Sequence, residues 1–368
     1  MPRLNATLEA PATRVEFVAS PVLDLMNLMY FTSLVPQIEG VDGWPERLRG
    51  EMAPDLLAEL DFLYNYPAGD PGLMGTLGDD LFAHPETWDG ADSLLAYVRR
   101  LHPGVADAEG NRGIQGIIYE TTFRYLDAPD RRPYEDMPPR QAIERRMRSL
   151  DDRDARTIMP VFDQPEELRR RMMRLIERFQ DEHYRREMSK RMPALERSVA
   201  VHRSEPATDP AQLARHLTGK TSSCLEGICE GPFRKLIFTP SLDMGPYNSC
   251  AVAGDVHGLY YPCEPRFIGS DSDDEETVRL ARIYKALGDE QRLRILRLLR
   301  DREMYAQEIV ERTGLHQSVV SRHLSFMKAV GVLEARRQNN MKFYSLNPAA
   351  GAELKKTLDL FAPTRVAN

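Results

Sequence analysis

The hydrophobic pattern of the first half of the chain is mainly helical. Residues 18–34 are apolar with scattered polar positions, which is typical of a mostly buried helix. The pattern predicts further helices at 55–64 and 92–101, whereas residues 117–126 fit either a helix or a strand. The clearest helix follows Asp163, which is placed to cap it, and its apolar face comprises Leu168, Met172, Leu175, Ile176 and Phe179. Arg and Glu fill the opposite face, which is therefore either an ion-paired solvated surface or a nucleic-acid patch.

Beyond Pro193 the pattern changes toward strands. Residues 198–202 alternate between polar and apolar, and residues 233–239 form a short apolar run. Residues 250–261 predict a hairpin that turns at Gly254 and the aspartate after it. These patterns predict an α+β fold, in which a mainly helical N-terminal domain carries a small antiparallel β region.

The last quarter of the chain has the spacing of three successive helices. Asp289 is placed to cap the first one, whose apolar face comprises Leu293, Ile295, Leu296 and Leu299. A short amphipathic helix over 306–313 ends at Gly314, and another helix is expected over 316–330. The glycine-containing turn between the last two helices is typical of a helix-turn-helix.

The surface of this segment suits DNA. The helix over 316–330 has Val320, Leu324 and Met327 on one face, and on the other it has Gln317, Ser318, Ser321, Arg322, Ser325 and Lys328. A face of Gln, Ser and basic residues without acids suits base edges and phosphates in a major groove. Residues 332–335 and 342–346 can pair around a basic and polar turn at 336–340. Helix, turn, helix and basic hairpin together predict a C-terminal winged helix-turn-helix.

Charge divides the chain in the same way. The formal charge of −7 for the whole chain argues against a polyanion-binding protein. From Thr277 onward, however, 17 Lys and Arg stand against 9 Asp and Glu, a net charge of +8 that leaves −15 for the preceding residues. The acidic run Asp271–Glu276 fits a solvated linker, the N-terminus of a helix, or a tether that competes with DNA for the basic module. We expect three parts: an N-terminal sensor or assembly domain at 1–268, an acidic linker at 269–276 and a DNA-binding domain at 277–368.

Three sequence strings carry a family resemblance. They are ALGDEQRLRILRLL, then AQEIVERTGL followed by VVSRHLSFMKAVGVLEARR, and KFYSLNP after the hairpin. Over about 70 residues they resemble the ArsR-type family of bacterial winged-helix transcription regulators. The resemblance implies a transcription regulator, which we expect to be a repressor. It identifies no ligand for the large N-terminal region.

The resemblance also implies where DNA would bind. It puts the second helix of the motif in the major groove, with Gln317, Ser318, Ser321 and Arg322 near bases and with His323 and Lys328 nearer the backbone. The candidate contacts on the hairpin are Arg336, Arg337, Asn339 and Lys342. It further implies a homodimer built from the flanking helices at 277–287 and 350–361. A two-fold dimer expects double-stranded DNA with an imperfect inverted repeat, whose half-sites lie about one turn apart.

Two positions depart from the family pattern. The residue that would cap the recognition helix is His316, and an imidazole caps poorly, so the start of that helix is open. The metal sensors of the family carry a Cys-x-Cys-type site on the preceding helix. The equivalent residues, 303–308, contain no cysteine, so we do not expect metalloid sensing at that place.

The four cysteines of the chain fall within one short window. Cys224, Cys229, Cys250 and Cys263 lie in or beside the β region, with His257 among them. Four thiolates could hold zinc or form a redox site. Their spacing is wide for a zinc knuckle, and ordinary buried or free thiols are the simpler interpretation. We expect no metal and no cofactor.

Motifs of catalysis and of membranes are not found. The sequence has no Gly-x-Ser-x-Gly, no His-Glu-x-x-His and no Walker loop, and Gly72–Gly78 is interpreted as a loop. No apolar run reaches the length of a membrane span and no secretory signal is evident, so we expect a cytoplasmic protein. The Met and aromatic residues of Leu25–Phe31 line an apolar ligand pocket or form core. The expected function is DNA-binding regulation, with room for a small-molecule effector. The alternatives are an enzyme or toxin-antitoxin-like module with an autoregulatory DNA-binding tail, and an architectural protein without an effector.

Overall fold

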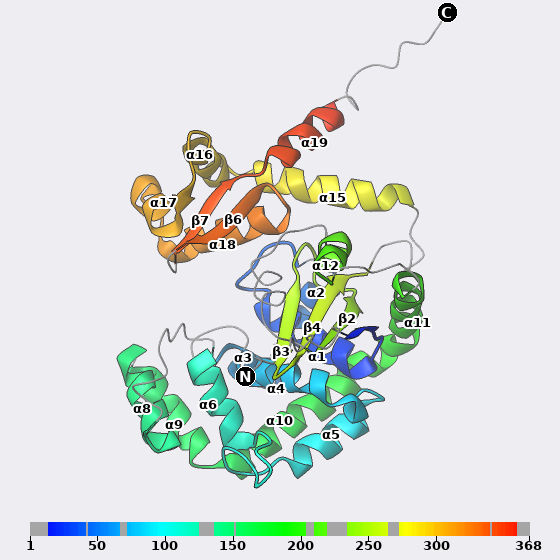
Figure 1. The fold of residues 1–368 in the computed structure, drawn as a ribbon, viewed down its shortest axis with the longest axis vertical. Coiled ribbons are helices and arrows are strands. Elements are labelled where there is room, and N and C mark those ends of the chain that lie inside the picture. The colour runs from blue at the N-terminus through cyan, green and yellow to red at the C-terminus, as the bar shows by residue number, and fades with distance from the viewer. Residues whose placement is uncertain are drawn as a thin grey trace, which may run out of the picture.

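The computed structural model describes residues 14–41, 43–66, 72–124, 136–150, 152–203, 210–218, 234–263, 272–338 and 341–358. These residues form a larger unit up to Cys263 and a smaller unit from Ser272 onward, each with buried apolar side chains (Figure 1). None of the described helices is both long and apolar enough to cross a membrane.

Helices make up most of the larger unit. They are α1 (Pro21–Leu34), α2 (Trp44–Glu51), α3 (Pro54–Asn65), α4 (Gly72–Asp80), α5 (Ala91–Arg100), α6 (Ile114–Arg124), α8 (Pro139–Leu150), α9 (Asp152–Phe162), α10 (Pro165–Phe179), α11 (Arg185–His202) and α12 (Pro210–Thr218). Short 3-10 turns, η1 (Leu81–Ala83) and η2 (Pro85–Thr87), follow α4, and a π-helical turn, η3 (Gln180–Tyr184), joins α10 to α11. The helices predicted at 18–34, 55–64 and 92–101 are confirmed as α1, α3 and α5, and the ambiguous segment at 117–126 falls largely in α6.

The predicted helix after Asp163 is confirmed as α10, with its five expected apolar residues all buried. Its N-cap position is Gln164 and not Asp163, and Gln164 makes no side-chain capping bond. The expected cap is wrong because the Asp163 carboxylate accepts from Arg140 at 2.7 Å instead.

One four-stranded sheet crosses the larger unit. Its strands are β1 (Arg14–Phe17), β2 (Lys235–Ser241), β3 (Ser249–Ala253) and β4 (Val256–Pro262), in the order β1-β2-β4-β3. The hairpin predicted around Gly254 is confirmed as β3 and β4. The expectation of an antiparallel β region is wrong for the rest of the sheet, because β2 pairs in parallel with both β1 and β4. After β2, the chain runs back as β3 at the edge of the sheet, one strand position away from β2. β4 then occupies the position between them, where it is antiparallel to β3 and parallel to β2.

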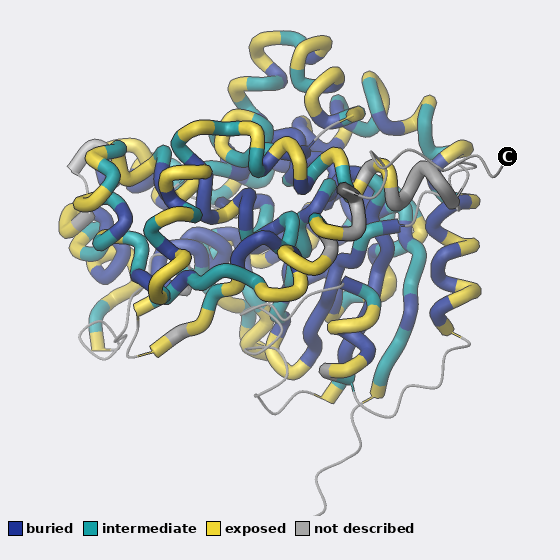
Figure 2. Tube along the Cα trace, turned by 90° about the horizontal axis from the view of Figure 1, so that it is seen from above, coloured by how far each residue is buried: buried dark blue, intermediate teal, exposed yellow. Residues whose placement is uncertain are grey.

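The sheet is covered by helices on both faces. Ile237 of β2 belongs to the core that contains residues of α1 and α4, whereas its neighbours Leu236 and Phe238 belong to a second buried cluster with residues of α11 and α12. Every residue of β2 after Lys235 is buried. A strand that is buried on both faces shows a continuous apolar run and no alternation. Figure 2 shows these buried strands enclosed by helices whose outer turns are exposed.

Residues 72–78, predicted to be a loop, form most of helix α4. Leu73, Met74 and Leu77 are fully buried in the core that α4 shares with α1 and α3. An interior glycine costs a helix about 1 kcal/mol relative to alanine. The burial of three large apolar side chains outweighs that cost, so the loop interpretation is wrong.

Residues 198–202, whose alternation suggested a strand, lie in helix α11, and Pro193 lies inside the same helix. Val199 is buried against the sheet, while Val201 is 41% exposed. Together with buried Leu195, this spacing is that of one helical face. The short run fits the repeat of a strand as well as that of a helix, and packing against the sheet stabilises the helix.

A buried ion-pair network joins α1, α11 and the segment after β2. Arg191 donates to both carboxylate oxygens of Asp24 at 2.7 Å and also to Asp243. Tyr184, in the π-helical turn, donates to Asp24 at 2.8 Å. The three charged side chains are at most 6% exposed, and burial raises the pKa of Asp243. One guanidinium thus holds two carboxylates that water does not reach.

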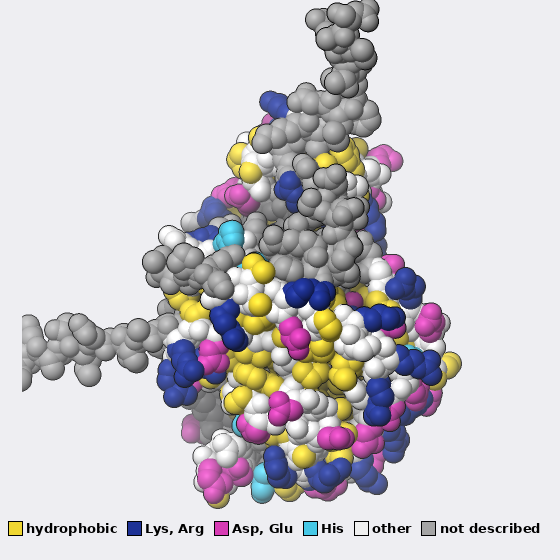
Figure 3. Space-filling model, turned by 90° about the vertical axis from the view of Figure 1, so that its right-hand side faces the viewer, with side chains coloured by type: hydrophobic (Ala, Val, Ile, Leu, Met, Phe, Trp, Pro, Cys, Tyr) yellow, Lys and Arg dark blue, Asp and Glu magenta, His cyan; other side chains and the backbone are white. Residues whose placement is uncertain are grey.

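The Arg-rich surface of α10 and α11 carries ion pairs. Arg171 pairs with Glu59 at 2.7 Å, and Arg178 pairs with Asp55 at 2.6 Å and with Glu182 at 2.7 Å. Figure 3 shows basic and acidic side chains interspersed over the side of the molecule that carries α11. The ion-paired interpretation is confirmed here, and the nucleic-acid patch has no support on this surface.

The smaller unit has the predicted winged helix-turn-helix. Its helices are α15 (Ser272–Leu287), α16 (Glu290–Leu299), α17 (Ala306–Thr313), α18 (Gln317–Ala329) and α19 (Pro348–Leu358). Its strands β5 (Met304–Tyr305), β6 (Leu333–Gln338) and β7 (Met341–Leu346) form an antiparallel sheet in the order β5-β7-β6. The sequence did not predict β5. Because β6 extends to Gln338, Arg336 and Arg337 lie in a strand and not in the turn predicted at 336–340.

Two further expectations need correction. Helix α15 begins at Ser272, so the acidic run from that residue onward is the N-terminus of a helix, as one of the alternatives predicted, and not a linker. Residues 264–271 lie outside the described residues. Leu293, assigned to the apolar face of α16, is 46% exposed. The buried positions of α16 are Arg292, Ile295 and Leu299, because Arg292 and not Leu293 faces the larger unit.

Candidate nucleic-acid interface

The start of α18 is set by the turn that precedes it. Gly314 ends α17 in the left-handed region at φ +69°, which glycine adopts without strain. His316 occupies the N-cap, and the Ser318 N–H donates to its Nδ1 at 3.4 Å. The Ser318 hydroxyl lies 2.8 Å from the same nitrogen. The weak imidazole cap is thus assisted by a serine, and the helix begins at Gln317.

The buried face of α18 determines which side chains point outward. Val320, Leu324 and Met327 are buried in the core of the smaller unit, as predicted. The exposed residues of the helix are Gln317, Ser318, Ser321, Arg322 and Ser325. Amide, hydroxyl and guanidinium groups match the donors and acceptors on base edges. This exposed face carries no acidic residue, and its side chains have the chemistry expected of a surface that binds the major groove of DNA.

Two candidate contacts on α18 lie away from this face. His323 is 4% exposed, and its Nε2 lies 3.2 Å from Oε1 of Gln291 on α16. Burial lowers the pKa of His323, which favours the neutral imidazole. Lys328 is half-buried near the end of the helix. The burial of His323 favours a role in packing α18 against α16 over a contact with the DNA backbone.

The candidate contacts of the hairpin are partly engaged within the protein. Arg336 donates to Glu303 at 2.7 Å, and this pairing lowers the pKa of Glu303. Lys342 Nζ lies 5.4 Å from the ring centroid of Tyr344. Asn339 lies outside the described residues, and of Arg337 only the backbone is described. Arg336 would have to exchange Glu303 for a phosphate in order to contact DNA.

A carboxylate of the larger unit reaches the recognition helix. Glu39 accepts from Arg292 at 2.6 Å, and its other oxygen lies 3.6 Å from Arg322 Nε and 4.0 Å from His323 Nδ1. Arg292 also donates to the carbonyl oxygens of Lys285 and Ala286 at the end of α15. One acidic side chain therefore faces three nitrogen-bearing side chains of the smaller unit.

The backbone around Glu39 fits closely between the two units. Gly40, at φ +83°, lies against the Phe326 ring, because a Cβ there would come within 2.6 Å of it. On the other side, a Cβ on Gly245 would meet the Gly40 carbonyl at 2.2 Å. Tyr247 donates its hydroxyl hydrogen to the Glu39 carbonyl at 2.5 Å. The loop is thus held from the β2–β3 connection while it touches α18.

The described cysteines do not form a metal site. Cys250 is disulfide-bonded, so the interpretation of the cysteines as buried or free thiols is wrong for Cys250. The thiol of Cys263 is buried and lies 3.9 Å from the Ala194 carbonyl oxygen, and Cys224 and Cys229 lie outside the described residues. His257 is buried in β4. Within the part of the chain that the structure describes, no group of His, Cys, Asp and Glu could hold a metal ion.

A polar hollow near η1 and α5 is where an enzyme could place acids and bases. Its charged groups pair with one another: Arg112 donates to Asp80 at 2.6 Å, and His84 lies 3.0 Å from Glu86. Asp107 accepts from backbone N–H groups, and the side-chain hydrogen bond from Asn111 lowers its pKa most. This mutual pairing favours a structural role over acid–base catalysis.

Comparison with known proteins accounts for the smaller unit. Residues 289–335 match the bacterial regulatory proteins of the arsR family. The transcriptional activator HlyU of Vibrio cholerae is 30% identical over 87 residues, which are 24% of this chain and 78% of that protein. The transcriptional repressor SdpR of Bacillus subtilis is 34% identical over 65 residues, which are 18% of this chain and 72% of that protein. The chain belongs to the arsR family. A homodimeric winged helix-turn-helix DNA-binding domain from Mycobacterium bovis, solved by NMR, is 31% identical, with 25% of this chain and 86% of that chain covered and a TM-score of 0.23.

As an arsR-family protein, the chain is a transcription regulator whose winged helix-turn-helix follows a large additional unit. The family match begins at residue 289, well after the four-stranded sheet. Sequence reasoning missed Glu39 as a residue near the recognition helix. Glu39 lies in no motif, and its contact with Arg292 joins residues 253 positions apart, so local sequence carries no signal for it.

Proposed function

We propose that this arsR-family protein is a homodimeric repressor that binds an imperfect inverted repeat in double-stranded DNA, in the cytoplasm where the chromosome lies. The observation that carries this proposal is the exposed face of α18, which presents Gln317, Ser318, Ser321 and Arg322 without an acid. A recognition helix of this kind lies in the major groove, and the hairpin β6–β7 follows the adjacent backbone.

Exposed apolar residues of the smaller unit support a homodimer. Leu293 is 46% exposed and Tyr284 is 39% exposed, on α16 and α15. A hollow of about 600 Å³ is lined by Leu293, Leu296 and Leu346 together with basic residues of α16. Helices α15 and α19 flank the motif at the positions where the family resemblance puts the dimer contact. Exposed apolar surface that another subunit would cover is typical of such an interface.

We further propose that the larger unit controls DNA binding in response to an effector. Its Glu39 carboxylate lies 3.6 Å from Arg322, a residue that we assign to base contact. A conformation that withdraws Glu39 frees this guanidinium for DNA, and an effector shifts the balance only by its differential affinity for the two conformations.

Footprinting of the purified full chain on its own upstream region tests the proposal. We expect two protected half-sites about 10–10.5 base pairs apart, centre to centre, or at a multiple of that spacing. The control is a duplex of shuffled sequence and equal composition at the same salt concentration. Equal protection of both duplexes, or protection of neither, would contradict sequence-specific binding. Addition of cell extract tests effector control, and a transcription reporter distinguishes repression from activation.

A further inference from the structure

A cavity of about 210 Å³ lies in the larger unit between α1, α3, α4 and the hairpin β3–β4. The sequence left open whether residues 25–31 line a pocket or form core. They do both, because Met26 and Tyr30 line this cavity while Leu25, Leu28 and Phe31 are buried core residues. An apolar cavity of about 150 Å³ in a protein core is enough for benzene. The space is thus large enough for a small ring compound, and it is below the ~300–1,000 Å³ of sites for drug-sized molecules.

Two glycines of α4 create the room. Gly75 and Gly78 both line the cavity and, three residues apart, share one face of the helix. A Cβ on Gly78 would meet only the end of the Met26 side chain, at the ordinary contact distance of 3.5 Å. The backbone therefore does not require glycine at position 78, and the missing side chain is what leaves space.

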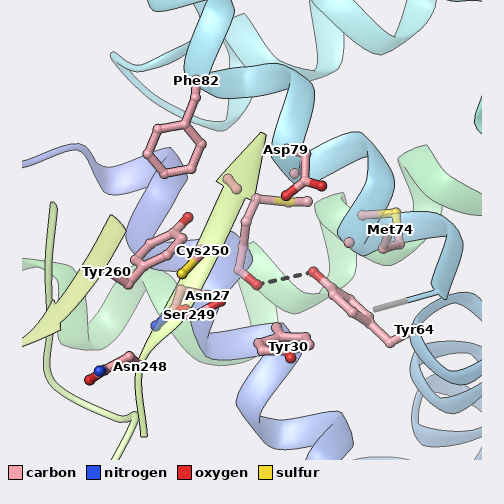
Figure 4. Close-up of a pocket in the computed structure, with 14 residues that line it drawn as sticks. Asn27, Tyr30, Tyr64, Met74, Asp79, Phe82, Asn248, Ser249, Cys250 and Tyr260 are labelled. Carbon is pink, nitrogen blue, oxygen red and sulfur yellow. Dashed lines mark hydrogen bonds between the residues drawn. The ribbon is translucent and has the colours of Figure 1, made fainter. Parts of the chain in front are cut away.

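Four aromatic rings line the cavity as two pairs. Phe82 and Tyr260 meet edge to face, with ring centroids 5.4 Å apart and ring planes at 90°. Tyr30 and Tyr64 are tilted by 45°, with centroids 6.2 Å apart. Figure 4 shows the two pairs on either side of the space. Because aromatic rings favour offset or edge-to-face neighbours at about 4.5–7 Å, a planar aromatic ligand finds partners on both sides.

The hydroxyl hydrogens of two tyrosines are already used. Tyr64 donates to the Met26 carbonyl at 3.1 Å, and Tyr260 donates to the Leu23 carbonyl at 3.3 Å. Burial raises the pKa of both phenols, so they keep their protons near neutral pH. What these two groups offer to a ligand is therefore oxygen lone pairs and ring faces.

An amide oxygen at the cavity lacks a partner. Asn27, which lines the cavity from α1, is 3% exposed, and its Nδ2 donates to the Ser241 hydroxyl oxygen at 2.6 Å. Its Oδ1 has no hydrogen-bond partner within the described part of the chain. A buried acceptor without a partner is costly, because it has lost its water and gained no other donor. A ligand N–H or O–H group that donates to this oxygen removes that cost.

Two other polar side chains of the wall are less suited to this role. Asp79 already has an interaction of its own within the protein. Asn248 also has an Oδ1 without a partner in the described chain, but Figure 4 shows its amide pointing away from Tyr30 and Tyr64. The donor of a ligand among the rings is therefore assigned to Asn27.

We infer that this cavity binds a small aromatic molecule with an N–H or O–H group, such as a phenol or an indole. Its ring packs between the two pairs of aromatic side chains, and its donor reaches Oδ1 of Asn27. Such a molecule would be the effector of the proposed regulator, and in that respect the inference rests on the proposed function.

The position of the cavity connects it to the winged helix. Asn248 and Ser249 line it, and the preceding residue, Tyr247, donates to the backbone of Glu39. Glu39 in turn pairs with Arg292 on α16. A ligand that displaces the start of β3 therefore acts on the same segment that holds the loop against α18.

Indole and benzofuran test the inference on the full chain without DNA. The two probes have the same fused-ring shape, and only indole carries a donor, its ring N–H. Titrations followed by NMR of labelled methionine methyl groups give both the Kd and the place of binding. We expect indole to bind about tenfold more tightly than benzofuran, because one hydrogen bond to a buried acceptor has about that effect. Equal or tighter binding of benzofuran, or no binding of indole, would overturn the inference.

The methionine signals locate the ligand in the unaltered protein. Met26 and Met74 line the cavity, whereas Met341 is 46% exposed on β7 of the smaller unit. The ring current of bound indole should shift the signals of Met26 and Met74 and leave that of Met341 in place. Shifts confined to other methionines would place the ligand elsewhere and refute the site.

Variants separate the shape of the cavity from its hydrogen bond. Gly78→Leu fills the cavity and should abolish indole binding, and Gly50→Leu, at an open helical position of α2, should leave it unchanged. Asn27→Leu should bring the Kd values of indole and benzofuran close together. Asn111→Leu, which removes an exposed side-chain hydrogen bond to Asp107, should preserve their difference.

Thermal unfolding of each variant verifies folding. Indole binding that survives in folded Gly78→Leu would refute the site. A preference for indole that survives in folded Asn27→Leu would show that Asn27 is not the acceptor. Because no DNA is present, failure of this test and failure of the footprint are independent results.

Discussion

Glu39 and Arg292 share a 2.6 Å hydrogen bond between a carboxylate and a guanidinium, although 253 residues separate them in the sequence. Arg292 is almost fully buried, and its guanidinium also lies 5.1 Å from the Phe326 ring centroid. The pair joins the larger unit to α16 beside the recognition helix, and the same carboxylate faces Arg322. In this conformation, a residue assigned to base contact has an acidic neighbour within its own chain.

Removal of the Glu39 charge should strengthen DNA binding. Glu39→Gln leaves a side chain of the same size but no longer competes with DNA for Arg322, so the Kd should fall several-fold. Fluorescence anisotropy with a labelled duplex measures it. Glu46→Gln, on the exposed surface of α2, is the matched control. Weaker binding by a fully folded Glu39→Gln would show that Glu39 supports the binding conformation instead of competing with it.

Loss of the Arg322 guanidinium should reduce both affinity and sequence preference. Arg322→Ala should weaken specific binding by about 1–3 kcal/mol, because a bidentate base contact has that value. Binding to the protected site and to singly substituted sites gives the specificity ratio. Arg170→Ala on α10, where Arg170 is exposed and pairs with Glu167 at 2.6 Å, should change little. Equal losses in the two variants would argue against a groove position for α18.

The hairpin should act on all DNA sequences alike. Arg336→Ala together with Arg337→Ala should lower affinity for every duplex and flatten the dependence of log K on log salt by about 0.9 for each lost phosphate contact. Glu303→Gln releases Arg336 and should have the opposite effect. In the Arg336→Ala background, Glu303→Gln should have almost no effect. A persistent effect there would mean that Glu303 repels DNA by itself.

The buried Arg191 should be essential for stability. Arg191→Met leaves the carboxylates of Asp24 and Asp243 buried without a counter-ion, so the larger unit should lose about 3–5 kcal/mol of unfolding free energy. Denaturant unfolding measures the change. Arg185→Met removes an exposed pair with Asp181 and should cost much less. Similar denaturant midpoints for Arg191→Met and Arg185→Met would contradict the role of Arg191 as the counter-ion of the two buried carboxylates.

Acidification should destabilise the winged helix through His323. Because burial lowers its pKa below that of the unfolded chain, folding favours the neutral form. The resulting stability is present above the unfolded pKa of about 6.5 and is lost as the pH falls toward the folded value. The unfolding midpoint of the smaller unit should therefore fall between pH 7.5 and 5.5. His323→Gln should reduce that fall, and an identical pH profile in the variant would remove His323 as its cause.

Prediction from sequence succeeded where one segment contains its own partners. The apolar face of α18 follows from Val320, Leu324 and Met327, and Gly314 marks the turn before it. It failed at α4 and at residues 198–202. There the local pattern was ambiguous, and burial against α1 or the sheet chose the helix. It also failed for the direction of strand pairing, because β1 and β2 come from opposite ends of the larger unit.

By itself, the sequence determined the winged helix-turn-helix and the residues that face outward on its recognition helix. Helical periodicity, a left-handed glycine and a short hairpin are encoded within residues 289–346, so no distant segment is needed to specify them. Only the tertiary structure decided that Glu39 lies beside Arg322, that Arg191 holds two buried carboxylates, and that Gly78 opens a cavity lined by tyrosines. Each of these features joins side chains from distant parts of the chain. Local periodicity does not bring these groups together; burial in a shared core or a close fit between backbone segments does.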